Sequence, residues 1–194
     1  MLRTPKALQA ARLVLAATAF ALGLSGCGGT AADPPPLHPS AAANFSCSSG
    51  QPFQHASLPY HLCFPASWSV RDYTAEPGSG GALSVVAFGP RPSVPDHISS
   101  LGQFAPPIEV RVESGSKTEA ESSSVEGNQV SPVTVAGTPA DRVTVVDNSL
   151  AQGSVIVFVE HEGNTYEIVK APGVGYQAQF DSALASFGFS SSTG

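Results

Sequence analysis

The cysteines and histidines of this chain are the side chains best able to bind a metal or to form a covalent link. Cys47 and Cys63 stand 16 positions apart (63 − 47 = 16), and two cysteines in an oxidising compartment typically form a disulfide. Closing a loop of this size would stabilise the fold by about 3 kcal/mol. The alternative is a metal site that adds His55 and His61 to the two thiols, but neither a C-x-x-C nor an H-x₃-H spacing is present. We predict the disulfide, and no metal or other cofactor.

Local motifs for hydrolysis are weak. Ser79 lies among glycines at 78–81, which predicts a flexible loop, because the G-x-S-x-G pattern of a nucleophile elbow, between a strand and a helix, is missing. His161 and Glu162 begin like a zinc-protease motif, but the second histidine is missing and the pair lies at an expected hairpin turn. We therefore predict a non-catalytic chain. A catalytic site whose residues are dispersed along the sequence is the alternative.

Other polar and aromatic residues favour structural roles. Asp141 and Arg142 are expected to form an ion pair on the surface, worth at most about 1 kcal/mol. Glu119 and Glu121 fall in a polar stretch and are expected to be solvated. Trp68, the only tryptophan, is expected to pack in the core beside the disulfide rather than to serve as a platform for a ligand.

The first 26 residues have the layout of an export signal. Three basic residues precede an apolar run at 13–24, which is shorter than the roughly 20 residues of a membrane-spanning helix. Leu24-Ser25-Gly26-Cys27 then resembles the lipobox of bacterial lipoproteins, in which the cysteine thiol receives a lipid and becomes the mature N-terminus. The resemblance predicts a lipoprotein signal peptide over 1–26 and lipidation of Cys27. An ordinary signal peptide with an incidental cysteine is the alternative.

The charge of the chain favours attachment by lipid rather than by basic residues. Removing Arg3, Lys6 and Arg12 with the signal would leave 9 − 3 = 6 basic residues against 15 acidic ones, a net charge of −9. A mature protein with this net charge is repelled by anionic headgroups and by phosphate polymers, so we expect no nucleic-acid partner. Acyl chains such as palmitate hold a protein stably when two or three are present. We expect the protein at the cell membrane, lipid-anchored on its extracytoplasmic face.

Composition separates a tether from a single domain. Residues 27–44 hold small residues and four prolines without an apolar face, which predicts a flexible tether with polyproline II structure at 34–36. Fully extended, about 17 such residues would reach roughly 50 Å from the membrane. Residues 45–189 are numerous enough to bury a core, and we expect one domain there. Residues 190–194 are expected to form a disordered tail.

Hydrophobic periodicity predicts a domain built mostly of antiparallel strands. The clearest case is 108–113, where three apolar residues alternate with three charged ones, as in a strand with one solvated face. Residues 153–160 are apolar on both faces, which predicts a central strand covered on both sides. Further strands are expected at 58–64, 68–73, 82–88, 130–135, 140–146 and 165–170, with turns at 65–67, 136–139 and 162–164.

Helices are expected between and after these strands. Tyr176, Phe180, Leu184 and Phe187 recur at helical spacing and would form one apolar face of a closing helix. Residues 117–126 are polar and predict a short surface helix, and 95–104 is a weaker candidate. Antiparallel strands combined with such helices predict an α+β domain, in which an antiparallel β-sheet is flanked by helices.

The order of four segments resembles a known family. Residues 58–68 (LPYHLCFPASW) are similar to an opening strand and turn, and 135–142 (VAGTPADR) to a glycine-containing turn before a central strand. Residues 163–168 (GNTYEI) and 180–189 (FDSALASFGF) are similar to a hairpin and a closing helix. In this order they resemble PsbP-like proteins, which include lipoproteins of bacterial envelopes. The resemblance implies an α/β/α sandwich and a protein that binds or assists assembly, and it supplies no catalytic residue.

Together these patterns predict a membrane-anchored, non-catalytic lipoprotein of the cell envelope. Its domain would be presented to a protein, cell-wall or lipid partner that the sequence does not name. The alternative is an exported hydrolase or metal-binding protein with a dispersed site. A pocket that gathers His55, His61 or His161 with a carboxylate would favour that alternative.

Overall fold

Alternation of apolar and charged residues produces the strand β5 (Ile108–Ser114) as predicted. The computed structural model describes residues 45–98, 106–146, 151–173 and 175–190, and β5 lies near the middle of their larger sheet. Its apolar side chains are buried: Ile108, Val110 and Val112. Cys27 and the predicted signal and tether lie outside the described residues.

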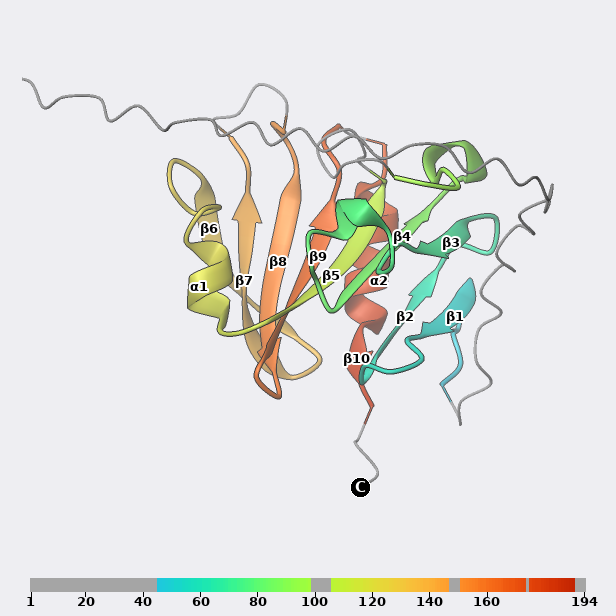
Figure 1. The fold of residues 1–194 in the computed structure, drawn as a ribbon, viewed down its shortest axis with the longest axis horizontal. Coiled ribbons are helices and arrows are strands. Elements are labelled where there is room, and N and C mark those ends of the chain that lie inside the picture. The colour runs from blue at the N-terminus through green and yellow to red at the C-terminus, as the bar shows by residue number, and fades with distance from the viewer. Residues whose placement is uncertain (1–44, 99–105, 147–150, 174, 191–194) are drawn as a thin grey trace, which may run out of the picture. The chain divides into compact units, whose positions relative to one another are not determined.

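Seven antiparallel strands form the large sheet in the described part of the chain, in the order β3-β4-β5-β9-β8-β7-β6 (Figure 1). Every strand predicted for this sheet is present, with ends that differ by a few residues. The bounds are β3 (Ser69–Asp72), β4 (Ser84–Gly89), β6 (Gln129–Val135), β7 (Thr138–Thr144), β8 (Val155–His161) and β9 (Asn164–Lys170).

Two tight turns fix the register of two strand pairs, β6 with β7 and β8 with β9. Residues 136–137 join β6 to β7, and residues 162–163 join β8 to β9; all four have positive φ, between 50° and 79°. Positive φ at both central positions identifies type I′ turns, whose twist matches that of the flanking strands. Both turns are shorter than predicted, because Thr138 and Asn164 already pair within the strands.

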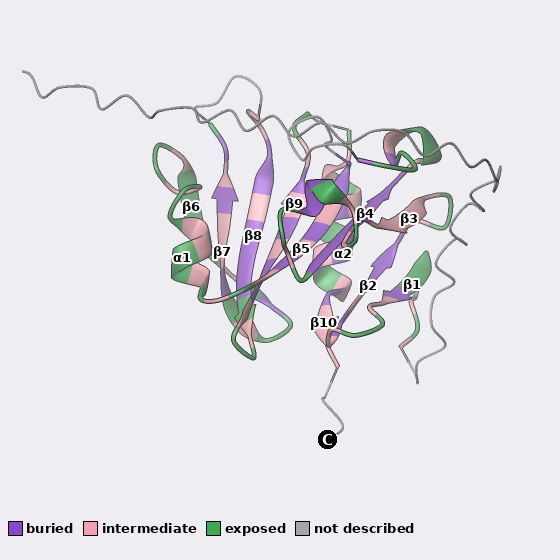
Figure 2. Ribbon diagram, in the orientation of Figure 1, coloured by how far each residue is buried: buried purple, intermediate pink, exposed green. Residues whose placement is uncertain are grey.

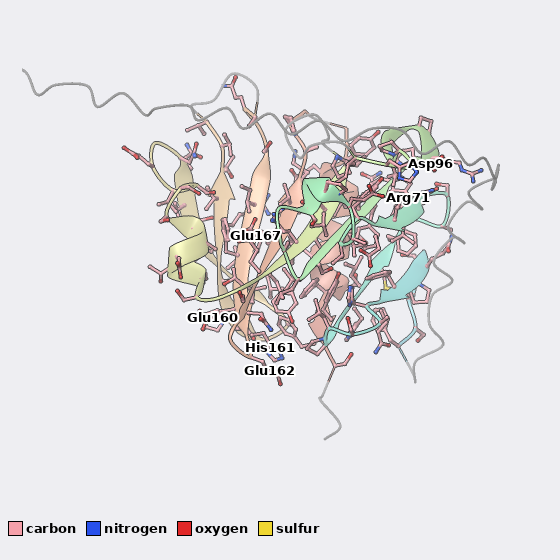
Figure 3. All side chains as sticks on the ribbon, in the orientation of Figure 1. Arg71, Asp96, Glu160, His161, Glu162 and Glu167 are labelled. Carbon is pink, nitrogen blue, oxygen red and sulfur yellow. A yellow bond between two sulfur atoms is a disulfide. The ribbon has the colours of Figure 1, made fainter. Side chains whose placement is uncertain are left out.

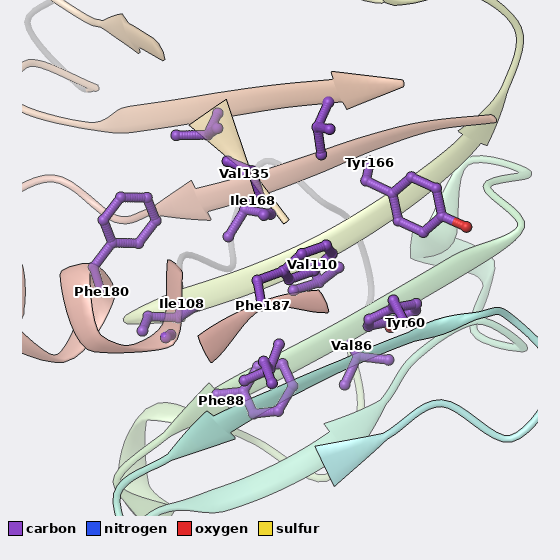
Figure 4. Packing of buried hydrophobic residues seen from close by; sticks show 14 of the residues in the cluster. Tyr60, Val86, Phe88, Ile108, Val110, Val135, Tyr166, Ile168, Phe180 and Phe187 are labelled. Carbon is purple, nitrogen blue, oxygen red and sulfur yellow. The ribbon is translucent and has the colours of Figure 1, made fainter. Parts of the chain in front are cut away.

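A second layer covers one face of the large sheet. It contains a three-stranded antiparallel sheet in the order β1-β2-β10 and the helix α2. Figure 4 shows aromatic side chains of this layer packed against β4, β5 and β9. The sequence predicted β2 and α2, but neither β1 nor β10. The bounds are β1 (Gln51–Gln54), β2 (Tyr60–Phe64), α2 (Gln177–Ser186) and β10 (Gly188–Phe189).

The opposite face of the large sheet is covered by short segments. Helix α1 (Lys117–Glu121) contacts β8. The 3₁₀ turn η1 (Pro77–Ser79) lies in the connection after β3, and the 3₁₀ turn η2 (Arg91–Ser93) lies in the connection after β4. Helix α1 is shorter than the predicted helix at 117–126. The other predicted helix is not present at 95–98, and its remainder lies outside the described residues. The connections after β3 and after β4 bury a second apolar cluster against β4: Tyr73, Val85, Ala87, Val94 and Ile98.

Burial follows the layering of the domain (Figure 2). Strand β8 is covered on both faces, since Val157, Phe158 and Val159 are all buried, which confirms the prediction of a central strand. Within the described ranges, the fold is mostly antiparallel β-sheet with two short helices. The predicted antiparallel sheet is therefore confirmed, whereas the helices flank it less than predicted. In the described part of the chain, no helix has the length and apolarity to cross a membrane.

Candidate functional site

The predicted disulfide is present. Cys47 and Cys63 are joined by an Sγ–Sγ bond of 2.01 Å, which ties the start of the described chain to β2. Two thiols of the alternative metal site are thereby consumed, and the remaining pair, His55 and His61, lies in two separate environments. Among the described residues, no group of three His, Cys, Asp or Glu side chains is arranged to hold a metal ion.

His55 belongs to a buried polar network. The backbone N–H groups of Ser57 and Leu58 donate to its Nδ1, at 3.2 and 3.0 Å, so the ring proton lies on Nε2. Nε2 is 3.2 Å from the hydroxyl oxygen of Ser84, to which it donates. Burial lowers the pKa of His55, and the carboxylate of Asp72, 4.0 Å from Nε2, only partly opposes this effect.

The serine, histidine and aspartate of this network do not have the geometry of a catalytic triad. In a triad, one ring nitrogen accepts the serine proton while the carboxylate binds the other nitrogen. Here Asp72 lies on the same side as Ser84, and the second nitrogen of His55 is occupied by backbone donors. The hydroxyl of Ser84 is also fully buried and lies 3.3 Å from the Tyr60 hydroxyl. The network therefore anchors the 55–58 turn to β4.

The other two candidate histidines pack on aromatic rings. His61 lies against Phe45, with ring centroids 4.1 Å apart, and its Nδ1 is 3.4 Å from the Ser190 hydroxyl. His161 is stacked on Phe189 with ring centroids 3.8 Å apart and lies at the β8–β9 hairpin, as its turn motif predicted (Figure 3). The structure thus places the three candidate histidines at three positions rather than in one pocket with a carboxylate.

A stripe of charged residues crosses the middle of the large sheet on the face opposite the main core. Arg111 on β5 donates to Glu113 Oε1 and to the carbonyl oxygen of Ser79, each at 2.7 Å. Glu167 on β9, labelled in Figure 3, is opposite Arg111 in the register, and the Arg111 charge attracts its carboxylate. Burial, followed by the charge of Glu113, raises the pKa of Glu167 to about 7.

This stripe corrects two predictions. Residues 109 and 111 of β5 are half-buried rather than solvated. Ser79 was placed in a flexible loop, yet it is buried in η1 and its carbonyl holds the Arg111 guanidinium. Both differences have the same cause, because the segment between β3 and β4 folds over the outer face of the sheet.

The predicted ion pair between Asp141 and Arg142 does not form. Successive residues of a strand point to opposite faces, so Asp141 pairs with Lys117 of α1, whereas Arg142 lies on the α2 side. There its guanidinium is 3.7 Å from Asp181 Oδ1 and 5.8 Å from the centre of the Phe180 ring. Glu119 is exposed as predicted, but Glu121 is partly buried. Burial and the neighbouring Asp141 carboxylate raise the pKa of Glu121.

Lys170 is a buried cation that the sequence did not single out. It is only 3% exposed, at the end of β9. Its Nζ donates to the carbonyl oxygens of Gly153, Ala171 and Gly173 at 2.9, 3.0 and 3.1 Å. The ammonium group therefore holds the chain before β8 against the chain after β9. Burial lowers the pKa of this amine.

A cavity of about 320 Å³ lies beside the disulfide. It is bounded by the chain after Cys47, by the end of β2 and its following turn, and by the outer side of α2. None of the described residues that line it carries a charge. They are Ser49, Gly50, Cys63, Phe64, Pro65, Ala66, Ala178, Gln179 and Ser182.

Trp68 and Tyr176, which follow and precede lining residues in the sequence, form an aromatic pair outside the lining itself. Their rings meet edge to face with centroids 5.4 Å apart. The backbone N–H of Trp68 donates to the carbonyl oxygen of Pro65 at 3.0 Å, which closes the turn that lines the cavity. Trp68 is half-buried against the edge of the main core. Its predicted core packing is therefore present in part.

Comparisons with known proteins concern the fold. The structure is similar to the solution structure of cyanobacterial PsbP (CyanoP) from Synechocystis sp. PCC 6803, with a TM-score of 0.41 and 14% sequence identity. The similarity covers 76% of this chain and 96% of that chain. No family model matches the sequence, and no curated protein matches it. We transfer no residue role from this neighbour.

Proposed function

We propose that this chain is a lipid-anchored protein of the bacterial cell envelope whose domain binds a partner without catalysing a reaction. In this proposal the thiol of Cys27 carries the lipid, and residues 28–44 connect it to the domain. The partner is a protein, a cell-wall component or a lipid on the extracytoplasmic side of the membrane.

The disulfide carries the proposal. The chain has three cysteines, and Cys47 is bonded to Cys63. This pairing supports an oxidising compartment, because structural disulfides are rare in the cytosol. It also leaves Cys27 as the single cysteine without a partner within the chain. That cysteine ends the LSGC motif directly after the apolar run, where a thiol is needed to form a thioether with a lipid.

The buried network around His55 supports binding rather than hydrolysis. Its ring presents a protonated nitrogen to Ser84, and the serine hydroxyl has no access to solvent. The resemblance of the sequence to PsbP-like proteins, which implies binding or assembly, agrees with this interpretation. No described feature favours a second candidate function.

Labelling with an alkynyl fatty acid tests the proposal. Cells that make the wild-type protein are expected to attach the label to it, and Cys27→Ser is expected to lose the label. The matched control is the double variant Cys47→Ser/Cys63→Ser, which removes the other two thiols and is expected to keep the label. Labelling that survives in Cys27→Ser, or that is absent from the wild type, would overturn the proposal.

A further inference from the structure

One wall of the cavity beside the disulfide is held in place at two points. The chain runs along β2 from Phe45, whose ring packs on His61 with centroids 4.1 Å apart, to Cys47, which is bonded to Cys63. Such a covalent clamp prevents this wall from relaxing into the space next to it. The cavity is therefore a stable feature of the domain.

At Gly50 the chain passes close to the backbone of Phe64, and this contact forms part of the cavity wall. Gly50 has a φ of +89°, and a Cβ at this position would collide with the carbonyl oxygen of Phe64. Only glycine tolerates both conditions without strain. The facing wall is the solvent side of α2, where Ala178 and Ser182 are exposed small residues. Small side chains on both walls leave room for an extended segment of chain.

The surroundings of the cavity favour an uncharged, proline-rich occupant. Extended segments with polyproline II structure bind in grooves that contain aromatic rings. Trp68 and Tyr176 are a half-buried pair beyond the lining, joined to the two walls through Pro65 and through α2. The hydroxyl and amide groups in the lining can hydrogen-bond to backbone carbonyls, and the lining has no charge to neutralise.

A segment with this chemistry precedes the described residues. Residues 34–39 read PPPLHP and contain no Asp, Glu, Lys or Arg. The chain enters the domain beside His61, and a strand rises about 3.3 Å per residue, so the cavity at Pro65 is about 13 Å away. The five residues 40–44 span up to about 17 Å when extended. Their length is therefore sufficient for 34–39 to reach the cavity of the same molecule.

We propose that the proline-rich segment 34–39 docks in this cavity within one molecule, with its rings against Trp68 and Tyr176. The docked segment shortens the connection between the lipid and the domain, and its release restores the full reach of the tether. This consequence for reach rests on the proposed lipid anchor, whereas the docking itself does not. The cavity thus sets how far the domain can extend from the membrane toward a partner.

The fluorescence of Trp68 tests the docking directly, because it is the only tryptophan in the chain. The full-length protein, purified in detergent, is compared with a variant in which Pro34, Pro35 and Pro36 are replaced by serine. Loss of docking leaves the half-buried indole more exposed to solvent, so we expect its emission to shift to the red and its quenching by acrylamide to increase. The control replaces Ala41, Ala42 and Ala43 by serine and is expected to leave both signals unchanged.

A second pair of variants tests the cavity itself. Ala178→Leu fills the cavity from an exposed helix position, whereas Ala185→Leu adds the same side chain to α2 outside the cavity. With the natural tether, Ala178→Leu is expected to reproduce the fluorescence of the proline variant, and Ala185→Leu that of the wild type. Near-ultraviolet circular dichroism confirms that both variants are folded.

Two results would overturn the docking proposal. The first is a Trp68 signal that does not change in the triple proline variant. The second is a difference that disappears on dilution, which would show that the segment binds a second copy of the chain. Neither result depends on lipidation, so a failure of docking is distinct from a failure of the fatty-acid labelling described above.

Discussion

The Nε2 atom of His55 lies 3.2 Å from the Ser84 hydroxyl oxygen while the Nδ1 atom of the same ring accepts two backbone N–H groups. This arrangement requires a neutral imidazole, because a protonated Nδ1 would face two other donors. The turn at 55–58 and the strand β4 are therefore joined by a contact that depends on pH.

We predict that the His55 contact weakens in acid. Burial lowers the pKa of His55 from its ordinary value of 6.5, so below about pH 6.5 the unfolded chain binds a proton that the folded chain does not. The free energy of unfolding should therefore fall as the pH drops below that value. In urea unfolding at pH 5 and pH 8, His55→Asn, which keeps an acceptor for the turn, is expected to show a smaller difference than the wild type. An equal difference would contradict the assignment.

Glu167 should have the opposite effect on stability. Its pKa of about 7 in the folded chain lies above its ordinary value of 4.5, so the folded state holds a proton that the unfolded chain releases. Stability contributed by this group is present below pH 4.5 and is lost as the pH rises through 7. Glu167→Gln is expected to gain about 2 kcal/mol over the wild type at pH 8 and little at pH 4. The exposed Glu119→Gln is the control, expected to change stability by less than about 0.5 kcal/mol at either pH.

Lys170 should be among the most sensitive polar residues of the domain. Lys170→Met keeps the length of the side chain but leaves three carbonyl groups without their donor. We expect a loss of about 2–4 kcal/mol in the free energy of unfolding, measured in urea at pH 7. Lys117→Met, which removes the partly buried pair with Asp141 and the attraction to Glu121, should cost less than Lys170→Met, because its partners keep access to solvent. Equal losses in the two variants would contradict this role for Lys170.

The β6–β7 turn offers a stabilising substitution. Ala136 has a φ of 52°, a left-handed conformation that costs a residue with a Cβ about 1 kcal/mol. Asparagine tolerates this conformation, and Asn-Gly is the preferred pair for a type I′ turn. Ala136→Asn is therefore expected to raise the melting temperature by several degrees, whereas Ala136→Val should lower it. A lower melting temperature for Ala136→Asn would contradict the claim that Ala136 is strained by its left-handed conformation.

The sequence predicts the strands in which apolar and polar side chains alternate. It misses the strands that form only by pairing with another strand. Strands β5 and β9 carry their own pattern of burial and are found close to where they are expected. Strands β1 and β10 have four and two residues without alternation. They form because β2 offers hydrogen-bonding groups on both of its edges.

The candidate site is less predictable for the same reason. The disulfide follows from the number and spacing of cysteines, but the network of His55, Asp72 and Ser84 joins three separate elements and leaves no local motif. Lys170 ends a strand that the sequence predicts, yet lysine is rarely buried. Its burial is visible only once the loops that supply its three carbonyl partners are in place.

Tandem mass spectrometry of the N-terminal peptide tests the central claim most directly. The protein is extracted from membranes of the producing bacterium and digested without reduction. We predict a mature chain that begins at Cys27, with a diacylglyceryl group on its sulfur. A chain that begins at another residue, or a Cys27 with a free thiol, would contradict the account of a lipid-anchored envelope protein.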